Sequence, residues 1–183
     1  MVLCLLLSFL YTASWGVARH HPYSIEYEGH VLWASLALAK GANIYSLTAL
    51  THEPYSVVIY NPLYFALGAF LQKLTGGTYE PLRLLSMASA LVSFLAFWRL
   101  LSLSRVSDLS KIITLAAFAA SLPVLHWSTV ARVDILGLAL SIIALERFSN
   151  SFINETERIN ETGSTAETKS SKETDSKASR PII

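Results

Sequence analysis

The feature that most constrains the fold is a strongly hydrophobic run without any charge between Arg83 and Arg99. With its flanks the run covers residues 82–103. At about 1.5 Å per residue, a helix of this length crosses the roughly 30 Å hydrocarbon core of a bilayer. Residues 82–103 are therefore predicted to form a membrane-spanning helix, with Arg99 near one end and able to extend to the membrane surface.

Three further apolar runs, residues 2–18, 111–127 and 133–148, predict three more spanning helices. The third of the four predicted spans contains Pro123, which is expected to break or kink it. Residues 2–18 also fit a signal peptide, because Gly16-Val17-Ala18 resembles a cleavage site, but the basic segment that usually starts such a peptide is missing. The sequence favours a retained helix.

The composition agrees with a protein dissolved in lipid. Hydrophobic residues make up 52% of the 183 residues, charged residues 15%, and the mean hydropathy is +0.44. A formal net charge of +1 without a basic cluster argues against a nucleic-acid partner. The fold class is therefore predicted to be an all-α membrane protein, with residues 1–148 as the membrane domain and membrane lipid as a partner.

A long amphipathic segment, residues 19–79, separates the first two predicted spans. We expect it to be an extracytoplasmic loop at headgroup depth, where tyrosine and tryptophan rings are favoured. Within it, residues 28–40 have helical apolar spacing and end before Gly41, a typical C-cap. A second helix is predicted over residues 63–74, with Pro62 in its first turn and a Gly-Gly pair after it. The loop thus contains two interfacial helices.

Residues 149–183 are rich in Ser, Thr, Glu, Lys and Asn and have few apolar side chains, so they predict a disordered polar tail. Basic residues in short connections indicate the membrane side. Those that fall together on one side are Arg99, Arg105, Lys111 and Arg147. We assign that side, with the N-terminus and the tail, to the cytoplasm of a multi-pass plasma-membrane protein.

Ionisable groups beside apolar helices are costly to bury and are therefore candidates for function. On the opposite side the predicted map gathers Glu26, Glu28, His30, Arg132 and Asp134. Carboxylates of this kind deprotonate a hydroxyl or hold a divalent cation, and arginine binds phosphate. The alternative is structural, because charges at helix ends also complement the helix dipole and anchor the helix. Residues two apart on a helix diverge by about 200°, so Glu28 is preferred over a joint site with Glu26.

The order of several short motifs produces a family resemblance. It consists of Glu28-Gly29-His30, a helix ending at Lys40-Gly41, then Asn43-Ile44-Tyr45, Tyr60-Asn61-Pro62-Leu63-Tyr64 and Leu82-Arg83-Leu84-Leu85-Ser86. This order resembles the front end of the GT-C membrane glycosyltransferases of the mannosyltransferase and aminoarabinose-transferase type. The likeness covers about residues 1–148 and continues at Asp134, which stands where such enzymes often carry an acidic residue at the start of the fourth span.

The resemblance implies a polyprenyl-phosphate-linked sugar as donor. Catalytic carboxylates would be Glu28, Asp134 and Glu26, and Glu28 with Asp134 would hold a divalent cation if one is used. The residues expected to bind substrate are Arg132, His30, Tyr60 and Tyr64. Tyr27 stands where the family usually has the first carboxylate of an acidic pair. The family also has more spanning helices after the fourth, so we expect a partial chain or a second chain that supplies the missing helices.

Two functions are carried forward. The first is a GT-C-like glycosyltransferase that moves a sugar from a lipid-phosphate carrier to an extracytoplasmic acceptor. The second is a non-catalytic small membrane protein, an assembly subunit or an inactive remnant, whose helices only pack against partners.

Overall fold

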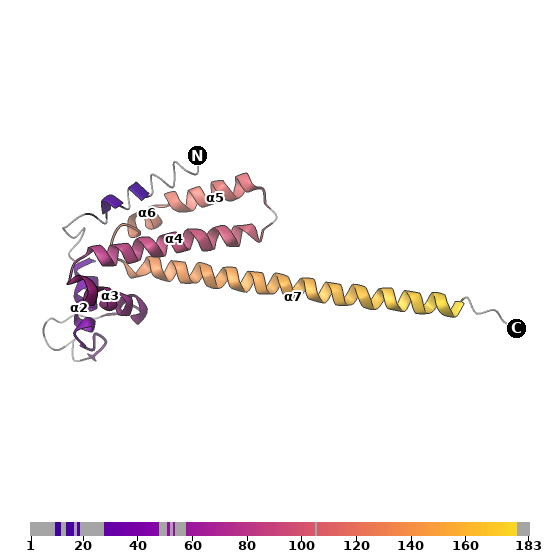
Figure 1. Ribbon diagram of the computed structural model, residues 1–183, viewed down its shortest axis with the longest axis horizontal. Helices are drawn as coiled ribbons and strands as arrows, with labels where there is room; N and C mark the ends of the chain where they lie inside the picture. Colours follow the sequence, from indigo (N-terminus) through magenta and orange to yellow (C-terminus); the bar gives the residue numbers. More distant parts are fainter. Residues whose placement is uncertain are drawn as a thin grey trace.

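The computed structural model describes residues 10–11, 14–16, 18, 28–47, 51, 53, 58–104 and 106–178, with the side chains of 122 and 160–178 left aside. Every regular element in these ranges is helical (Figure 1). The all-α prediction is therefore confirmed. Most of the predicted span 2–18, and Glu26, lie outside the described residues.

The clearest predicted span is α4, Glu80–Ser102. Pro81 lies in its first turn, where a missing N–H costs no hydrogen bond, and Glu80 and Arg99 complement the helix dipole at the two ends. The helix is long and apolar enough to cross a membrane, and so is the part of α7 from Val133 to Ile159. The structure thus contains two candidate membrane-spanning helices in its described residues, where the sequence predicts four.

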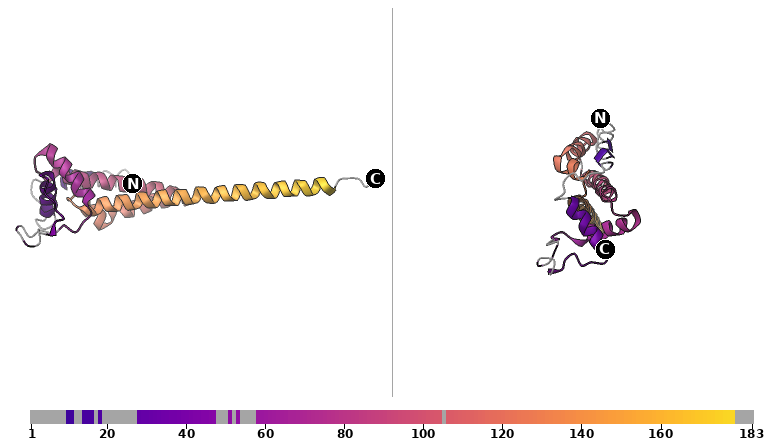
Figure 2. Two further views of the ribbon diagram at one scale, coloured as in Figure 1. Left: turned by 90° about the horizontal axis from the view of Figure 1, so that it is seen from below. Right: turned by 90° about the vertical axis from the view of Figure 1, so that its left-hand side faces the viewer.

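Helices α4 and α7 lie side by side over the first part of α7 (Figures 1 and 2). Beyond the first turn of α4, its buried face is made of small residues spaced three or four apart, namely Ser86, Ser89, Ala90, Ser93 and Ala96. Small side chains let two helix backbones approach closely. Two of the serines are satisfied within the helix, because the Ser89 and Ser93 hydroxyls donate to the carbonyls four residues earlier at 2.8 and 2.9 Å. The hydroxyl hydrogens of Ser89 and Ser93 therefore have acceptors without water.

The outer faces of the same two helices carry large exposed apolar side chains. They include Leu84, Val92, Leu95 and Trp98 on α4 and Leu140, Leu145 and Phe148 on α7. In water such a surface would be unfavourable, by about 25 cal/mol for each Å². A lipid environment would remove that cost.

The predicted third span, residues 111–127, is not one helix. The chain forms α5, Asp108–Ala120, and the short α6, Leu122–Trp127, separated at Ser121, whose ψ of 133° is extended. Proline at 123 lacks an N–H and clashes with the preceding turn, so a helix cannot run straight through it. Pro123 instead takes an early position in α6, where it is tolerated. The break was predicted, and it leaves two helices that are each too short to cross a bilayer.

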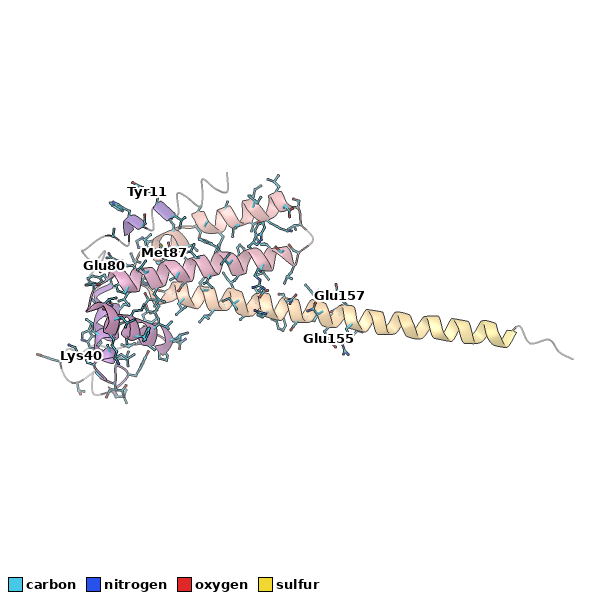
Figure 3. The ribbon with its side chains drawn as sticks, in the orientation of Figure 1. Tyr11, Lys40, Glu80, Met87, Glu155 and Glu157 are labelled. Carbon is cyan, nitrogen blue, oxygen red and sulfur yellow. The ribbon has the colours of Figure 1, made fainter. Side chains whose placement is uncertain are left out.

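Residues 149–178, for which the composition predicts a polar tail, are helical in the structure. Helix α7 runs as one element, Val133–Ala178, and projects far beyond the other helices (Figures 1 and 2). A helix that is already formed pays no new nucleation cost when it is extended. The Arg158–Glu155 ion pair at i,i+3 also supports this segment, with a distance of 2.8 Å. Figure 3 shows Glu155 and Glu157 on the part of α7 that lies past the end of α4.

The region predicted as an interfacial loop contains the two expected helices, α2, His30–Ala39, and α3, Pro62–Thr75. The C-cap glycines Gly41 and Gly76 have positive φ values of 86° and 84°, as predicted for helix ends. The two helices pack on each other and on the start of α4 at one end of the molecule (Figure 1). Their common core contains Val31, Ala34, Ile44, Val58, Tyr64, Phe65, Leu82 and Ala131. In its described residues the segment is therefore a packed helical unit and not an extended loop, because its apolar residues bury one another.

Candidate functional site

A buried ion pair joins the segment before α2 to the first turns of α4. The Arg83 guanidinium donates from Nε and Nη2 to the two carboxylate oxygens of Glu28, each at 2.8 Å, and both side chains are 1% exposed. The parallel two-bond arrangement is the strongest form of an arginine–carboxylate contact. The ring of Tyr79 lies 5.4 Å from the guanidinium carbon and adds a cation–π contact.

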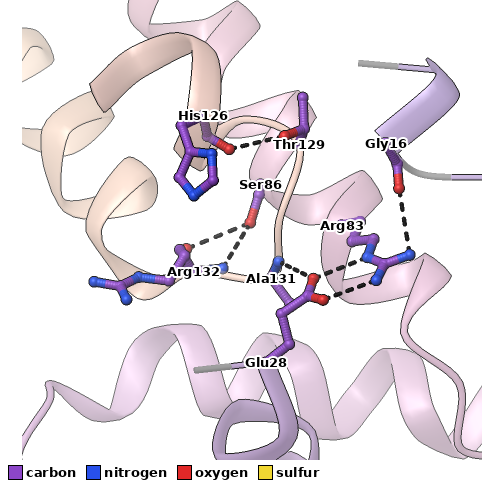
Figure 4. Close-up of polar contacts among 8 residues, drawn as sticks. All are labelled: Gly16, Glu28, Arg83, Ser86, His126, Thr129, Ala131 and Arg132. Carbon is purple, nitrogen blue, oxygen red and sulfur yellow. Dashed lines mark hydrogen bonds and ion pairs between the residues drawn. The ribbon is translucent and has the colours of Figure 1, made fainter. Parts of the chain in front are cut away.

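The same pair also fixes two other parts of the chain (Figure 4). Glu28 Oε1 accepts a hydrogen bond from the Ala131 backbone N–H at 2.9 Å, and Arg83 Nη1 donates to the Gly16 carbonyl at 3.3 Å. Segments far apart in the sequence therefore meet at one charged centre. A carboxylate with at least three hydrogen bonds and almost no exposure is poorly placed to take a proton from a substrate.

A second polar contact lies beside the ion pair and is made of hydroxyl groups. The Ser86 hydroxyl accepts from the Arg132 N–H at 3.2 Å and is 3.0 Å from the Tyr64 hydroxyl, which donates to the Leu82 carbonyl at 2.9 Å. Burial raises the pKa of Tyr64 well above its usual value; the Glu28 carboxylate raises it further, and the bond to Ser86 acts in the opposite direction. The tyrosine thus stays protonated and holds α3 against α4.

The turn that enters α7 carries the second charged pair. Arg132 donates from Nε to Asp134 Oδ2 at 2.8 Å, and its Nη2 lies 2.7 Å from the same oxygen. The Trp127 ring lies 5.6 Å from the guanidinium carbon. Asp134 is 28% exposed at the side chain and lies in the first turn of α7, where the helix dipole stabilises a negative charge. Both arginine contacts use Oδ2, which leaves Oδ1 outside the ion pair.

A pocket of about 210 Å³ lies between the start of α3 and the start of α7. It is lined by Tyr60, Asn61, Leu63, Tyr64, Val133, Asp134, Leu136, Gly137 and Leu140. The wall is mainly apolar, with one carboxylate, one amide and two tyrosines. The Tyr45 hydroxyl fixes the rim by donating to the Tyr60 carbonyl at 2.8 Å. Such a pocket suits a ligand that has both a polar hydroxyl-bearing part and an apolar part.

The structure brings some of the predicted site residues together and separates others. Tyr60, Tyr64 and Asp134 line one pocket, and Arg132 holds Asp134 in place. Glu28 instead lies in the buried pair with Arg83. His30 begins α2, where its ring lies 5.8 Å from that of Trp33 and burial lowers its pKa.

No group of three or more His, Cys, Asp or Glu side chains capable of holding a metal ion occurs among the described residues. The two carboxylates proposed as cation ligands, Glu28 and Asp134, are each in contact with an arginine. The divalent cation of the sequence-based hypothesis therefore stays a prediction.

Two residues of this region were not selected from the sequence as site residues, Arg83 and Ser86. In the sequence Arg83 marks the charged end of a spanning helix and belongs to the motif Leu82-Arg83-Leu84-Leu85-Ser86. Its position in the first turns of an apolar helix was the available signal, because a buried guanidinium there needs a carboxylate partner, and Glu28 was already a candidate. Beyond its place in that motif, Ser86 carried no signal of its own, since a serine on the small-residue face of a helix is ordinary.

Comparison of the chain with protein-family models, with curated proteins and with solved structures found no match.

Proposed function

We propose that this chain is part of a GT-C-like membrane glycosyltransferase, in which Asp134 serves a reaction between a polyprenyl-phosphate-linked sugar and an acceptor hydroxyl. The observation that carries the proposal is the pocket between α3 and α7. It unites Tyr60 and Tyr64 with Asp134, residues that the family resemblance selected from two distant parts of the sequence.

The proposal places the protein in a membrane as a multi-pass protein. Helix α4 and the first part of α7 cross the bilayer, and the pocket opens at the extracytoplasmic end. Arg99 and Arg147 lie near the other end, on the cytoplasmic side. Along α4 the distance from Arg83 to Arg99 corresponds to roughly 24 Å of helix, which is close to the thickness of the hydrocarbon core. Charged residues near both ends of this length support the placement.

In the proposed reaction the acceptor hydroxyl attacks the anomeric carbon of the donor sugar. The bond between that carbon and the phosphate oxygen breaks, and the polyprenyl phosphate leaves with the electron pair. Asp134 takes the hydroxyl proton through its carboxylate, whose Oδ2 is fixed by Arg132. The tyrosines and Asn61 would orient the sugar, and the apolar wall would contact the first isoprene units.

The test measures sugar transfer by the purified chain in proteoliposomes, with a panel of synthetic polyprenyl-phosphate hexoses and pentoses and release of polyprenyl phosphate as the readout. Asp134→Asn should lower the rate by about 10²- to 10⁴-fold, the usual contribution of a general base. The matched control is Asp108→Asn, because Asp108 is also in a first helical turn and pairs with a nearby cation, but lies on α5 with its side chain 84% exposed. Full activity of Asp134→Asn would exclude this carboxylate as the base.

One observation favours the second candidate, a non-catalytic membrane protein. Glu28, the first acidic residue of the resemblance, is engaged in a structural ion pair. If the panel gives no transfer with the wild-type chain, and the chain co-purifies with a membrane enzyme that loses activity without it, an assembly role replaces the enzymatic one.

A further inference from the structure

The end of the α4–α7 pair that lies away from the pocket carries a separate charged cluster. Glu146 of α7 is 9% exposed at its side chain, and its Oε1 lies 3.7 Å from Arg99 Nε of α4. Its other oxygen, Oε2, lies 3.5 Å from Arg147 Nε. We call these three residues the arginine cluster. It has two positive charges and one negative charge.

Both arginines of the cluster are turned mostly to the outside, with side chains 63% and 70% exposed. The contact of each arginine with the glutamate is through Nε, at 3.7 Å for Arg99 and 3.5 Å for Arg147. A guanidinium has five N–H donors in a planar fork, so a contact through Nε leaves the Nη groups to meet an anion. Two arginines without a carboxylate between them would repel each other. The buried Glu146 carboxylate offsets this repulsion and keeps the two guanidiniums near each other.

Large exposed apolar side chains lie close to the cluster along the same two helices. Trp98 precedes Arg99 and is 38% exposed, while Phe148 and Phe152, with rings 6.5 Å apart, are 70% and 66% exposed. Aromatic rings and arginines at one level of two apolar helices are typical of the boundary between headgroups and acyl chains. The surface therefore matches a ligand with an anionic head and apolar chains.

We propose that the arginine cluster is a binding site for the phosphate headgroup of an anionic phospholipid in the cytoplasmic leaflet. Its two guanidiniums donate to the phosphate, and the aromatic residues contact the glycerol and upper acyl chains. The site rests on α4 and α7 crossing a membrane and not on sugar transfer, so it can fail while the glycosyltransferase proposal holds, and the reverse.

The experiment is native mass spectrometry of the full chain in dodecyl maltoside micelles with added dioleoylphosphatidylglycerol or dioleoylphosphatidylcholine. We expect the wild-type chain to retain phosphatidylglycerol in preference to phosphatidylcholine. Each cation near an anionic surface contributes about fivefold in affinity, so Arg99→Gln/Arg147→Gln should weaken phosphatidylglycerol binding roughly 25-fold. Arg158→Gln is the control, because Arg158 is an equally exposed arginine on α7 with its own acidic partner.

The double variant leaves Glu146 buried without its partners, and a triple variant with Glu146→Gln removes that cost. It should still bind phosphatidylglycerol at least about fivefold more weakly than the wild type, from the loss of one net charge. In a third arm, sodium phosphate at the same concentration as the lipid tests whether the phosphate group alone is enough for binding. In addition, 0.5 M NaCl should weaken binding of phosphatidylglycerol to the wild type, because salt screens exposed charges.

Loss of binding in the double and triple variants, with Arg158→Gln unchanged, supports the site. Equal retention of the two lipids by the wild type, or unchanged binding in the triple variant, overturns it. Competition by inorganic phosphate as effective as that by phosphatidylglycerol would also overturn it, since the acyl chains would then contribute nothing.

Discussion

The buried pair of Glu28 and Arg83 allows the sharpest test of how the structure is held together. Replacing Arg83 by Gln leaves a carboxylate with 1% exposure and without its cation. Replacing Glu28 by Gln leaves the opposite situation, a buried guanidinium. The double substitution Glu28→Gln/Arg83→Gln removes both charges, and Gln at position 28 keeps an oxygen for the Ala131 N–H.

Removal of one partner from a buried pair costs about 3–5 kcal/mol, because the remaining charge stays desolvated. We therefore expect each single substitution to lower the free energy of unfolding by about 3–5 kcal/mol. The double variant should be less destabilised than the sum of the two singles by about 2 kcal/mol or more, because it strands no charge. A structural role predicts this coupling whatever the chemistry of the pocket.

The assay is unfolding of the detergent-solubilised chain by titration with SDS, followed by tryptophan fluorescence and far-ultraviolet circular dichroism. The matched control is the exposed pair Glu155 and Arg158, for which the same cycle should show little coupling, as is usual for surface pairs. Additive losses from Glu28→Gln and Arg83→Gln would refute the reasoning. So would stable single variants, because a buried ion pair cannot be broken without cost.

Three further predictions concern the packed helices around the site. Gly68→Ala should lower the free energy of unfolding by about 1–3 kcal/mol, because a Cβ there would lie 2.6 Å from Ser35 Oγ and 2.9 Å from Leu82 Cδ2. Gly137→Ala is the control: a Cβ there would have nothing within 4 Å, so the substitution should raise the free energy of unfolding by up to about 1 kcal/mol. Equal effects of the two substitutions in thermal unfolding would contradict this packing. Burial lowers the pKa of His30 below 6.5, so the unfolded state binds the proton more readily and the free energy of unfolding should fall as the pH drops below about 6.5. The His30→Gln variant should therefore lose less stability than the wild type between about pH 7 and 5. Parallel curves of stability against pH for the two proteins would exclude the effect. Ser86→Ala removes the hydroxyl that the Arg132 N–H and Tyr64 contact, at an expected cost of about 1–3 kcal/mol in SDS unfolding, and no loss would show that these bonds are replaced.

Much of the helix arrangement could be predicted because it follows from local chemistry. Pro62 has a fixed φ that suits the first turn of a helix, and Gly41 and Gly76 tolerate the positive φ that ends one. Helices α2 and α3 therefore appear close to where they were expected. The same holds for the break before α6, since Pro123 cannot continue a helix.

The structure departs from these expectations where the conformation of a segment depends on its neighbours in space. Residues 149–178 have a composition typical of disorder, but they continue a helix that the apolar start of α7 has already nucleated. Residues 19–79 were interpreted as a loop because their polar and apolar residues are mixed. The packing of the described helices α2 and α3 beside α4 depends on contacts between residues far apart in the sequence.

The candidate site shows the same division. The motif order selected Tyr60, Tyr64 and Asp134, and these line one pocket. The partner of Glu28 could not be read from spacing, because Arg83 lies 55 positions away and the ion pair forms only when α4 packs against the start of α2.

The measurement that tests the central proposal most directly is photocrosslinking with a diazirine-bearing polyprenyl-phosphate mannose, a hexose probe of the proposed donor class, in proteoliposomes, with the labelled peptides located by mass spectrometry. The proposal predicts label in the segments 60–64 and 133–140 that form the pocket, competed by unlabelled polyprenyl-phosphate mannose. Label confined to α5 or to the distal part of α7, or label that the competitor leaves unchanged, would contradict a lipid-linked sugar site beside Asp134.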